Sequence, residues 1–187
     1  MLIKTLFSGF GGQGVLSMGT TLATAAMLEG KYVTYFPAYG VEVRGGTANC
    51  TVVVSDEEIA SPVASDPEFV VAMNQPSFAR FQSILQPGGL LCVNSSIVNT
   101  ETARSDIEVL AIPTTELAEQ IGTSKVANMI MLGALVRASH MISYEAMVEN
   151  LTEILGEGKA KLLKLNREAL ALGYDYSLRN REVTECP

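Results

Sequence analysis

Three glycines near the start of the chain form the pattern that most directly suggests chemistry. Gly9, Gly11 and Gly14 fit the spacing G-x-G-x-x-G, after a short apolar run and before a segment that we expect to be helical. A glycine turn between a strand and a helix exposes backbone N–H groups at the positive end of the helix dipole. We therefore expect Gly11, Gly12 and Gly14 to favour a phosphate or carboxylate. The alternative is that the glycines only allow a tight turn against a neighbouring chain.

The residues that accompany this motif in nucleotide-binding proteins are missing. A dinucleotide site needs an acid at the end of the second strand to bind the ribose hydroxyls, but residues 34–37 are Thr, Tyr, Phe and Pro. A P-loop needs Lys followed by Ser or Thr, where this chain has Val15 and Leu16. Both patterns count against NAD binding and nucleotide hydrolysis. A stand-alone nucleotide-binding oxidoreductase domain stays an alternative.

A second loop is expected beside the glycine turn. The segment 39–47, Tyr-Gly-Val-Glu-Val-Arg-Gly-Gly-Thr, begins at the end of the second expected strand and so should lie at the carboxyl edge of the sheet, where ligands collect. Arg44 could bind a phosphate or carboxylate through two hydrogen bonds, and Glu42 could orient Arg44 or pair with a cation of a partner. A plain ion pair between the two is the alternative.

Two amides are further candidates. Gln13, at the start of the expected helix, could donate its amide to a ligand or cap the turn. Asn128 stands just inside a strongly apolar helical segment, where it either bonds a neighbouring backbone or faces a ligand. His140, the single histidine, is expected at a helix end or on the surface, and Cys50 and Cys92 as buried, inert thiols.

The elements that position these residues alternate between strand and helix. A strand at 2–7, a helix at 15–28 and a strand at 32–36, ended by Pro37, open the chain. Further strands are expected at 48–54, 69–73, 90–93 and 107–112, with a helix at 77–85 whose start carries Asn74 and Pro76. From about 114 onward the chain is expected to be helical almost throughout. This order predicts an α/β fold: a Rossmann-like, mostly parallel sheet with helices on both faces and a helical C-terminal segment.

Residues 126–136 are expected to be buried on every side. These eleven residues carry no charge, and Gly133 and Ala134 allow another backbone to approach closely. A helix that is apolar all round packs either under the domain's own cap or in a partner.

Length and composition narrow the class further. We expect one domain over residues 1–187, with 176–187 as a flexible tail. The chain carries 13 Lys or Arg against 20 Asp or Glu, a net charge of −7, so nucleic acid is not an expected partner. Three widely spaced cysteines cannot build a cluster or zinc site within this chain. We expect a cytoplasmic protein without signal peptide or membrane span.

Four motifs together resemble a known family. They are G-F-G-G-Q-G-V at 9–15, G-V-E-V-R-G-G at 40–46, N-Q at 74–75 and N-M-I-M-L-G-A at 128–134. In this order they resemble the gamma subunit or domain of the 2-oxoacid:ferredoxin (acceptor) oxidoreductases, most of all the gamma chains specific for 2-oxoglutarate. The resemblance covers about residues 3–175, and the two glycine-rich blocks are far more specific than one glycine loop.

The resemblance implies a multisubunit enzyme that decarboxylates a 2-oxoacid oxidatively with coenzyme A, yielding an acyl-CoA such as succinyl-CoA, carbon dioxide and a reduced acceptor. It implies that this chain alone is inactive and holds no cofactor. Thiamine diphosphate with magnesium and the iron–sulfur clusters would belong to alpha, beta and ferredoxin-like delta subunits. An external ferredoxin, flavodoxin or quinone-linked acceptor would take the electrons.

For this chain the resemblance and the loops together suggest a non-catalytic module that helps to form the approach of coenzyme A. The expected contact residues are Gly11, Gly12, Gln13, Gly14, Glu42, Arg44 and Asn128, with no catalytic or metal-ligating residue. A purely structural scaffold, in which the loops touch only protein, is the remaining alternative.

Overall fold

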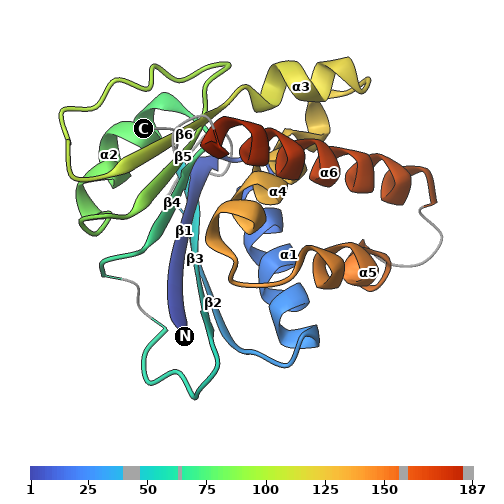
Figure 1. Ribbon diagram of the computed structural model, residues 1–187, viewed down its shortest axis with the longest axis horizontal. Coiled ribbons are helices and arrows are strands. Elements are labelled where there is room, and N and C mark those ends of the chain that lie inside the picture. Colours follow the sequence, from blue (N-terminus) through green and yellow to red (C-terminus); the bar gives the residue numbers. More distant parts are fainter. Residues whose placement is uncertain (40–46, 63–64, 156–159, 183–187) are drawn as a thin grey trace.

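Strands and helices alternate along the chain in the computed structural model, which describes residues 1–39, 47–62, 65–155 and 160–182 (Figure 1). The strands are β1 (Leu2–Phe10), β2 (Tyr32–Tyr39), β3 (Thr47–Ser55), β4 (Phe69–Ala72), β5 (Leu90–Asn94) and β6 (Glu108–Ile112). The helices are α1 (Val15–Leu28), α2 (Gln75–Phe81), α3 (Thr114–Gln120), α4 (Ala127–Ser139), α5 (Tyr144–Leu155) and α6 (Ala160–Glu182), with short 3-10 turns η1 (Gln82–Ile84) and η2 (Ser124–Val126).

These strands form one sheet in the order β2-β3-β1-β4-β5-β6. β1, β4, β5 and β6 pair in parallel, whereas β3 is antiparallel to both β1 and β2. β3 alone therefore runs against the other strands, and the predicted mostly parallel α/β fold is confirmed. One detail differs from a simple βαβ opening: β3 lies between β1 and β2, because β2 and β3 follow each other along the chain and pair as an antiparallel hairpin.

Pro37 does not end β2, as the sequence suggested. The strand continues to Tyr39, and Pro37 pairs in register with Cys50 of β3. β2 is the last strand at its side of the described sheet, and an edge strand tolerates a residue that has no N–H to donate. The predicted helix at 77–85 is also shorter, because its second half forms η1.

The two faces of the sheet are covered by different helices (Figure 1). α1, α4, α5 and α6 lie over one face and α2 over the other. Successive strand residues point to opposite faces, so Phe7 and Val71 enter the larger core while Leu6 and Val70 pack under α2. Helices on both faces are thus confirmed.

The apolar segment 126–136 forms η2 and most of α4, and all eleven of its residues are buried. α6 packs against α4 at a close crossing. This confirms the predicted burial and assigns it to the chain's own helical cap rather than to a partner. α6 continues to Glu182 and so includes the first residues of the segment predicted as a tail. No helix within the described ranges has both the length and the apolar composition needed to cross a membrane.

Candidate functional site

The glycine turn lies where the sheet changes the side on which its helices pack. β1 and β4 are parallel neighbours, but the helix after β1, α1, lies on one face and the helix after β4, α2, on the other. In open α/β sheets, ligands bind at the carboxyl edge at such a switch point. The glycine turn follows β1 there, and Asn74 follows β4.

The turn itself leaves backbone donors at the start of α1. Gly12 and Gly14 adopt positive φ values of 99° and 73°, which side chains other than glycine rarely accept. Gly11 and Gly12 are exposed, and Gly14 caps α1 without any side-chain acceptor for the N–H groups of the first turn. These groups have no partner within the helix, so the turn can receive an anion at the positive end of the helix dipole.

Gln13 fastens the turn to the neighbouring strand. Its Oε1 accepts hydrogen bonds from the backbone N–H of Phe10 at 2.7 Å and from Nδ2 of Asn74 at 3.1 Å. Its Nε2 donates to the carbonyl oxygen of Met73 at 2.9 Å. The sequence left two roles open for Gln13, donating to a ligand and capping the turn. In the structure its hydrogen bonds fix the turn.

Asn74 is the site residue that the sequence-based prediction of contacts omitted. Besides binding Gln13, its Oδ1 accepts from the backbone N–H of Ser77 at 2.8 Å, so Asn74 caps α2. An asparagine directly after a buried strand, at the edge where the glycine turn lies, was the available signal. Through Gln13 and Asn74 the starts of α1 and α2 are linked across the switch point.

The structure brings Asn128 to the glycine turn from a distant part of the chain. Asn128 is the second residue of α4, and only 9% of it is exposed. Its Nδ2 donates a long hydrogen bond of 3.5 Å to the carbonyl oxygen of Gly14, and its side chain fills the space beside the Cα of that glycine. This contact joins the buried helix α4 to the start of α1.

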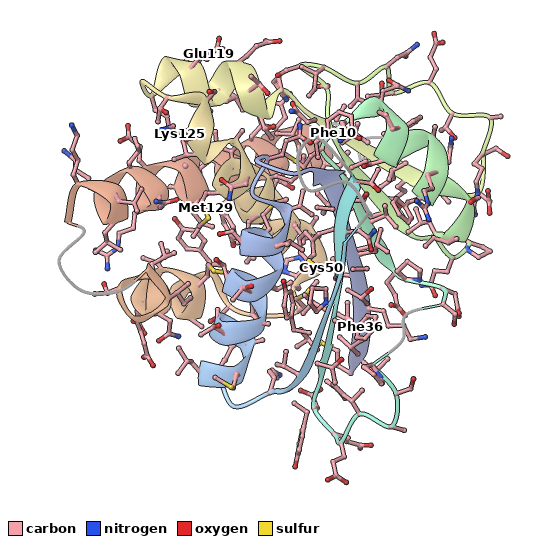
Figure 2. All side chains as sticks on the ribbon, turned by 180° about the vertical axis from the view of Figure 1, so that it is seen from behind. Phe10, Phe36, Cys50, Glu119, Lys125 and Met129 are labelled. Carbon is pink, nitrogen blue, oxygen red and sulfur yellow. The ribbon has the colours of Figure 1, made fainter. Side chains whose placement is uncertain are left out.

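Glu42 and Arg44 lie outside the described residues. The strands that flank them place the ends of their segment at the carboxyl edge, because Tyr39 pairs with Ala48 and Thr47 pairs with Phe10. Figure 2 labels Phe10, the last residue of β1 and the one that precedes the glycine turn.

Three of the segments at the carboxyl edge of the sheet carry no charge. The segments 9–17, 73–78 and 94–100, which follow β1, β4 and β5, contain no Asp, Glu, Lys, Arg or His. Binding of an anion along these three segments would therefore rest on backbone N–H groups and neutral side chains.

Known proteins share this chain's sequence and fold. A family model described as "Pyruvate ferredoxin/flavodoxin oxidoreductase" matches residues 4–176. The chain belongs to this family. The ketoisovalerate oxidoreductase subunit VorA of Methanothermobacter marburgensis is 36% identical over 180 residues, which are 96% of this chain but 37% of VorA. The chain thus spans little more than a third of the length of that relative.

Two other relatives match nine-tenths or more of this chain. The 2-oxoglutarate synthase subunit KorC of Methanocaldococcus jannaschii is 34% identical over 171 residues, 90% of each chain. The crystal structure of the keto/oxoacid ferredoxin oxidoreductase gamma subunit from Geobacter sulfurreducens PCA superposes with a TM-score of 0.81 at 29% identity, covering 95% of this chain and 99% of that one. The predicted resemblance to gamma subunits is confirmed.

In this member of the oxidoreductase family, Cys50 lies in the core and His140 at the end of a helix. Cys50 is fully buried between α1 and the sheet (Figure 2). Removal from water raises the pKa of its thiol to about 12, although hydrogen bonds with Tyr35 and the backbone of Gly19 act in the opposite direction. Such a thiol is protonated and unreactive at neutral pH, as predicted. His140 caps the C-terminus of α4 and is exposed.

The described residues of this chain form no cluster of potential metal ligands. No group of three or more His, Cys, Asp or Glu side chains there could hold a metal ion. Cys50 and Cys92 are both buried and form no disulfide.

Proposed function

We propose that this chain is the gamma subunit of a multisubunit 2-oxoacid:ferredoxin oxidoreductase. The holoenzyme decarboxylates a 2-oxoacid, transfers the acyl group to the sulfur of coenzyme A and passes the two released electrons to ferredoxin or a comparable acceptor. The isolated chain would be inactive. The observation that carries the proposal is the match, at 34% identity over 90% of both chains, to a 2-oxoglutarate synthase subunit of nearly the same length.

2-Oxoglutarate is the proposed substrate, and succinyl-CoA the product. Several 2-oxoglutarate synthase subunits match most of this chain. Ketoisovalerate is the second candidate, since VorA is slightly more similar to this chain, at 36% identity. In this proposal the sister subunits contact the substrate's side chain, so this chain does not distinguish 2-oxoglutarate from ketoisovalerate. An activity assay with each oxoacid decides between them.

Within the holoenzyme, the glycine turn would help to form the approach of coenzyme A. The N–H groups at Gly11, Gly12 and Gly14 would donate to a phosphate, with Arg44 as the cation and Glu42 to orient it. Gln13 and Asn128 would hold the turn in place through the contacts described above. Preorganised donors of this kind bind a phosphate without further loss of entropy in the loop.

The other components are assigned to sister subunits. Alpha and beta subunits would hold thiamine diphosphate with magnesium, and a ferredoxin-like delta subunit would hold the iron–sulfur clusters. We place the complex in the cytoplasm. The low charge of the described carboxyl-edge segments suits a chain that buries this edge in an assembly.

The first test is to purify the tagged chain anaerobically from its native host and to assay acceptor-dye reduction with coenzyme A and either 2-oxoglutarate, ketoisovalerate or pyruvate. Co-purification of thiamine- and cluster-bearing subunits in fixed proportion, with activity on one oxoacid, supports the proposal. A chain that emerges alone with a bound nucleotide or its own turnover would support the stand-alone oxidoreductase domain instead.

The role in coenzyme A approach is tested separately with Arg44→Ala in the holoenzyme. We expect the KM for coenzyme A to rise about tenfold or more, because a charged hydrogen bond contributes about 1.5–3 kcal/mol, while the KM for the oxoacid stays unchanged. The control is Arg167→Ala, which removes an exposed charge on α6. Unchanged coenzyme A affinity with normal assembly would favour the scaffold alternative.

A further inference from the structure

No helix of the described residues covers one part of the sheet face on which α2 packs. α2 and η1 pack over β1, β4 and β5, where Phe78 and Phe81 share one buried apolar cluster with Leu6, Val70 and Leu91. The neighbouring part of the same face belongs to β2 and β3. From the pairing register, the residues of β2, β3 and the start of β1 that point to this side are Leu2, Lys4, Tyr32, Thr34, Phe36, Ala38, Thr47, Asn49, Thr51, Val53 and Ser55. Val53 and Ser55 are buried, so the chain itself already covers part of this face. We call Leu2, Tyr32, Thr34, Phe36, Asn49 and Thr51 the β2–β3 strip.

Large apolar side chains of the β2–β3 strip are left in water. Phe36 is 53% exposed, Tyr32 is 50% exposed and Leu2 is 46% exposed, while Thr34, Asn49 and Thr51 are only half-buried. Phe36 lies on β2, the edge strand (Figure 2). Sheets of this class normally have both faces covered, and exposed aromatic residues on a strand surface mark interaction sites.

The rim of the strip is acidic. Asp56, Glu57 and Glu58 follow the end of β3 directly beside Leu2 and Tyr32, and all three are exposed. Asp66 reaches the strip's own side of the sheet, where its Oδ2 lies 4.0 Å from Nζ of Lys4.

The cations beside the strip are already paired. Lys31 and the N-terminal ammonium of Met1 both bind Asp56, at 2.6 Å and 2.9 Å, and Lys4 faces Asp66. Hydrogen bonds from Lys31 and from the N-terminal ammonium lower the pKa of Asp56 to about 2, so this acid stays ionised. With Glu57 and Glu58, four carboxylates face these three cations, so the rim keeps an excess of one negative charge.

This charge distribution selects the occupant. A second copy of the chain would bring two acidic rims together, and like charges across an interface disfavour association. A partner with an apolar centre and a basic rim would be attracted. Resting on the proposed function, we infer that the β2–β3 strip is the docking surface for a catalytic sister subunit of the same oxidoreductase, one that presents an apolar patch ringed by Lys or Arg.

The direct test is hydrogen exchange on the assembled complex and on the isolated full chain. We expect peptides of β2 and β3 to exchange at least tenfold more slowly in the complex, whereas the outer turns of α6 remain unchanged. This measurement uses the wild-type protein, so it does not depend on the folding of any variant.

Variants then test the apolar centre and the rim. Tyr32→Ala with Phe36→Ala should weaken binding to the sister subunits at least thirtyfold, since central aromatic residues dominate interfaces. Leu162→Ala, which removes a 42% exposed side chain on α6, should change it less than threefold. Glu57→Lys with Glu58→Lys should weaken binding and reduce its dependence on salt, whereas Glu168→Lys on α6 should do neither.

The outcomes separate this inference from the proposed function. A complex that forms normally, with β2 unprotected and the strip variants without effect, overturns the docking surface but leaves the subunit role standing. An isolated chain that dimerises and loses its dimer in the Phe36→Ala variant assigns the strip to a second copy and also overturns it. A wild-type chain that binds no sister subunit removes both proposals.

Discussion

Gly133 of α4 and Gly173 of α6 stand at the same helix crossing, each against the backbone of the other helix. A Cβ placed on Gly133 would collide with the carbonyl oxygen of Leu170, and one on Gly173 would collide with that of Ile130. This close approach lets α6 cover the apolar helix that carries Asn128, and thereby keeps Asn128 against the glycine turn.

Gly173→Ala should destabilise the chain by about 3 kcal/mol or more, because the helices must separate along their whole crossing to admit one methyl group. Gly133→Ala should behave in the same way. Chemical denaturation followed by circular dichroism measures the loss. Thr152→Ala, at an exposed position of α5, is the matched control and should gain a few tenths of a kcal/mol from helix propensity. Equal stability of all three variants would contradict the close crossing.

Gln13 and Asn74 should act as a coupled pair. Gln13→Ala removes three hydrogen bonds and should cost about 2 kcal/mol, and Asn74→Ala removes the cap of α2 at a cost of about 1–2 kcal/mol. Because either substitution removes the hydrogen bond that joins the two side chains, a double-mutant cycle should give a coupling of about 0.5–1.5 kcal/mol. Gln13 with Asn94, whose amide binds Thr115 instead, should be additive within about 0.5 kcal/mol.

Gly14→Ala should destabilise the chain by about 2–4 kcal/mol for two separable reasons. A left-handed backbone costs an alanine about 1 kcal/mol, and the new methyl group would collide with the side chain of Asn128. Combining it with Asn128→Ala should relieve the collision and leave mainly the backbone cost. If the double variant were as unstable as the sum of the single ones, the contact would not limit the turn.

The buried thiol of Cys50 predicts a loss of stability at alkaline pH. Its pKa is about 12 in the folded chain and about 8.5 in the unfolded chain, so the folded state keeps a proton that the unfolded state releases. Below about pH 8.5 the thiol is protonated in both states and does not lower the free energy of unfolding. Between about pH 8.5 and about pH 12 it lowers that free energy by up to about 1.4 kcal/mol per pH unit. Cys50→Ala should flatten the slope of unfolding free energy between pH 8.5 and 10, whatever its effect on stability at neutral pH. An unchanged slope would show that the thiol is not desolvated.

The site could be predicted from the sequence where one local segment carries the signal. Gly9 to Gly14, a strand before them and a helix after them predicted the turn and its exposed donors. Asn74 was predicted as a helix start, which its bond to Ser77 confirms. Its bond to Gln13, 61 residues away along the chain, depends on β1 and β4 being neighbours, and no local pattern encodes that pairing.

The order of the sheet shows the same limit. Alternating apolar strands and helices predicted an α/β fold, but not that β3 would insert antiparallel between β1 and β2. That position follows from competition between pairings across the whole sheet, in which the hairpin of β2 and β3 forms with a short connection. The same insertion produces the β2–β3 strip, which no run of residues announces.

The sequence by itself determined the glycine turn, the alternation of strands and helices, the burial of the uncharged helix α4 and membership of the family, because each rests on residue type and local spacing. Only the tertiary structure decided that Gln13 binds Asn74, that Asn128 packs on Gly14, and that two glycines let α6 cross α4. These contacts join segments distant in the chain, and their formation depends on the balance of burial and chain entropy over the entire fold.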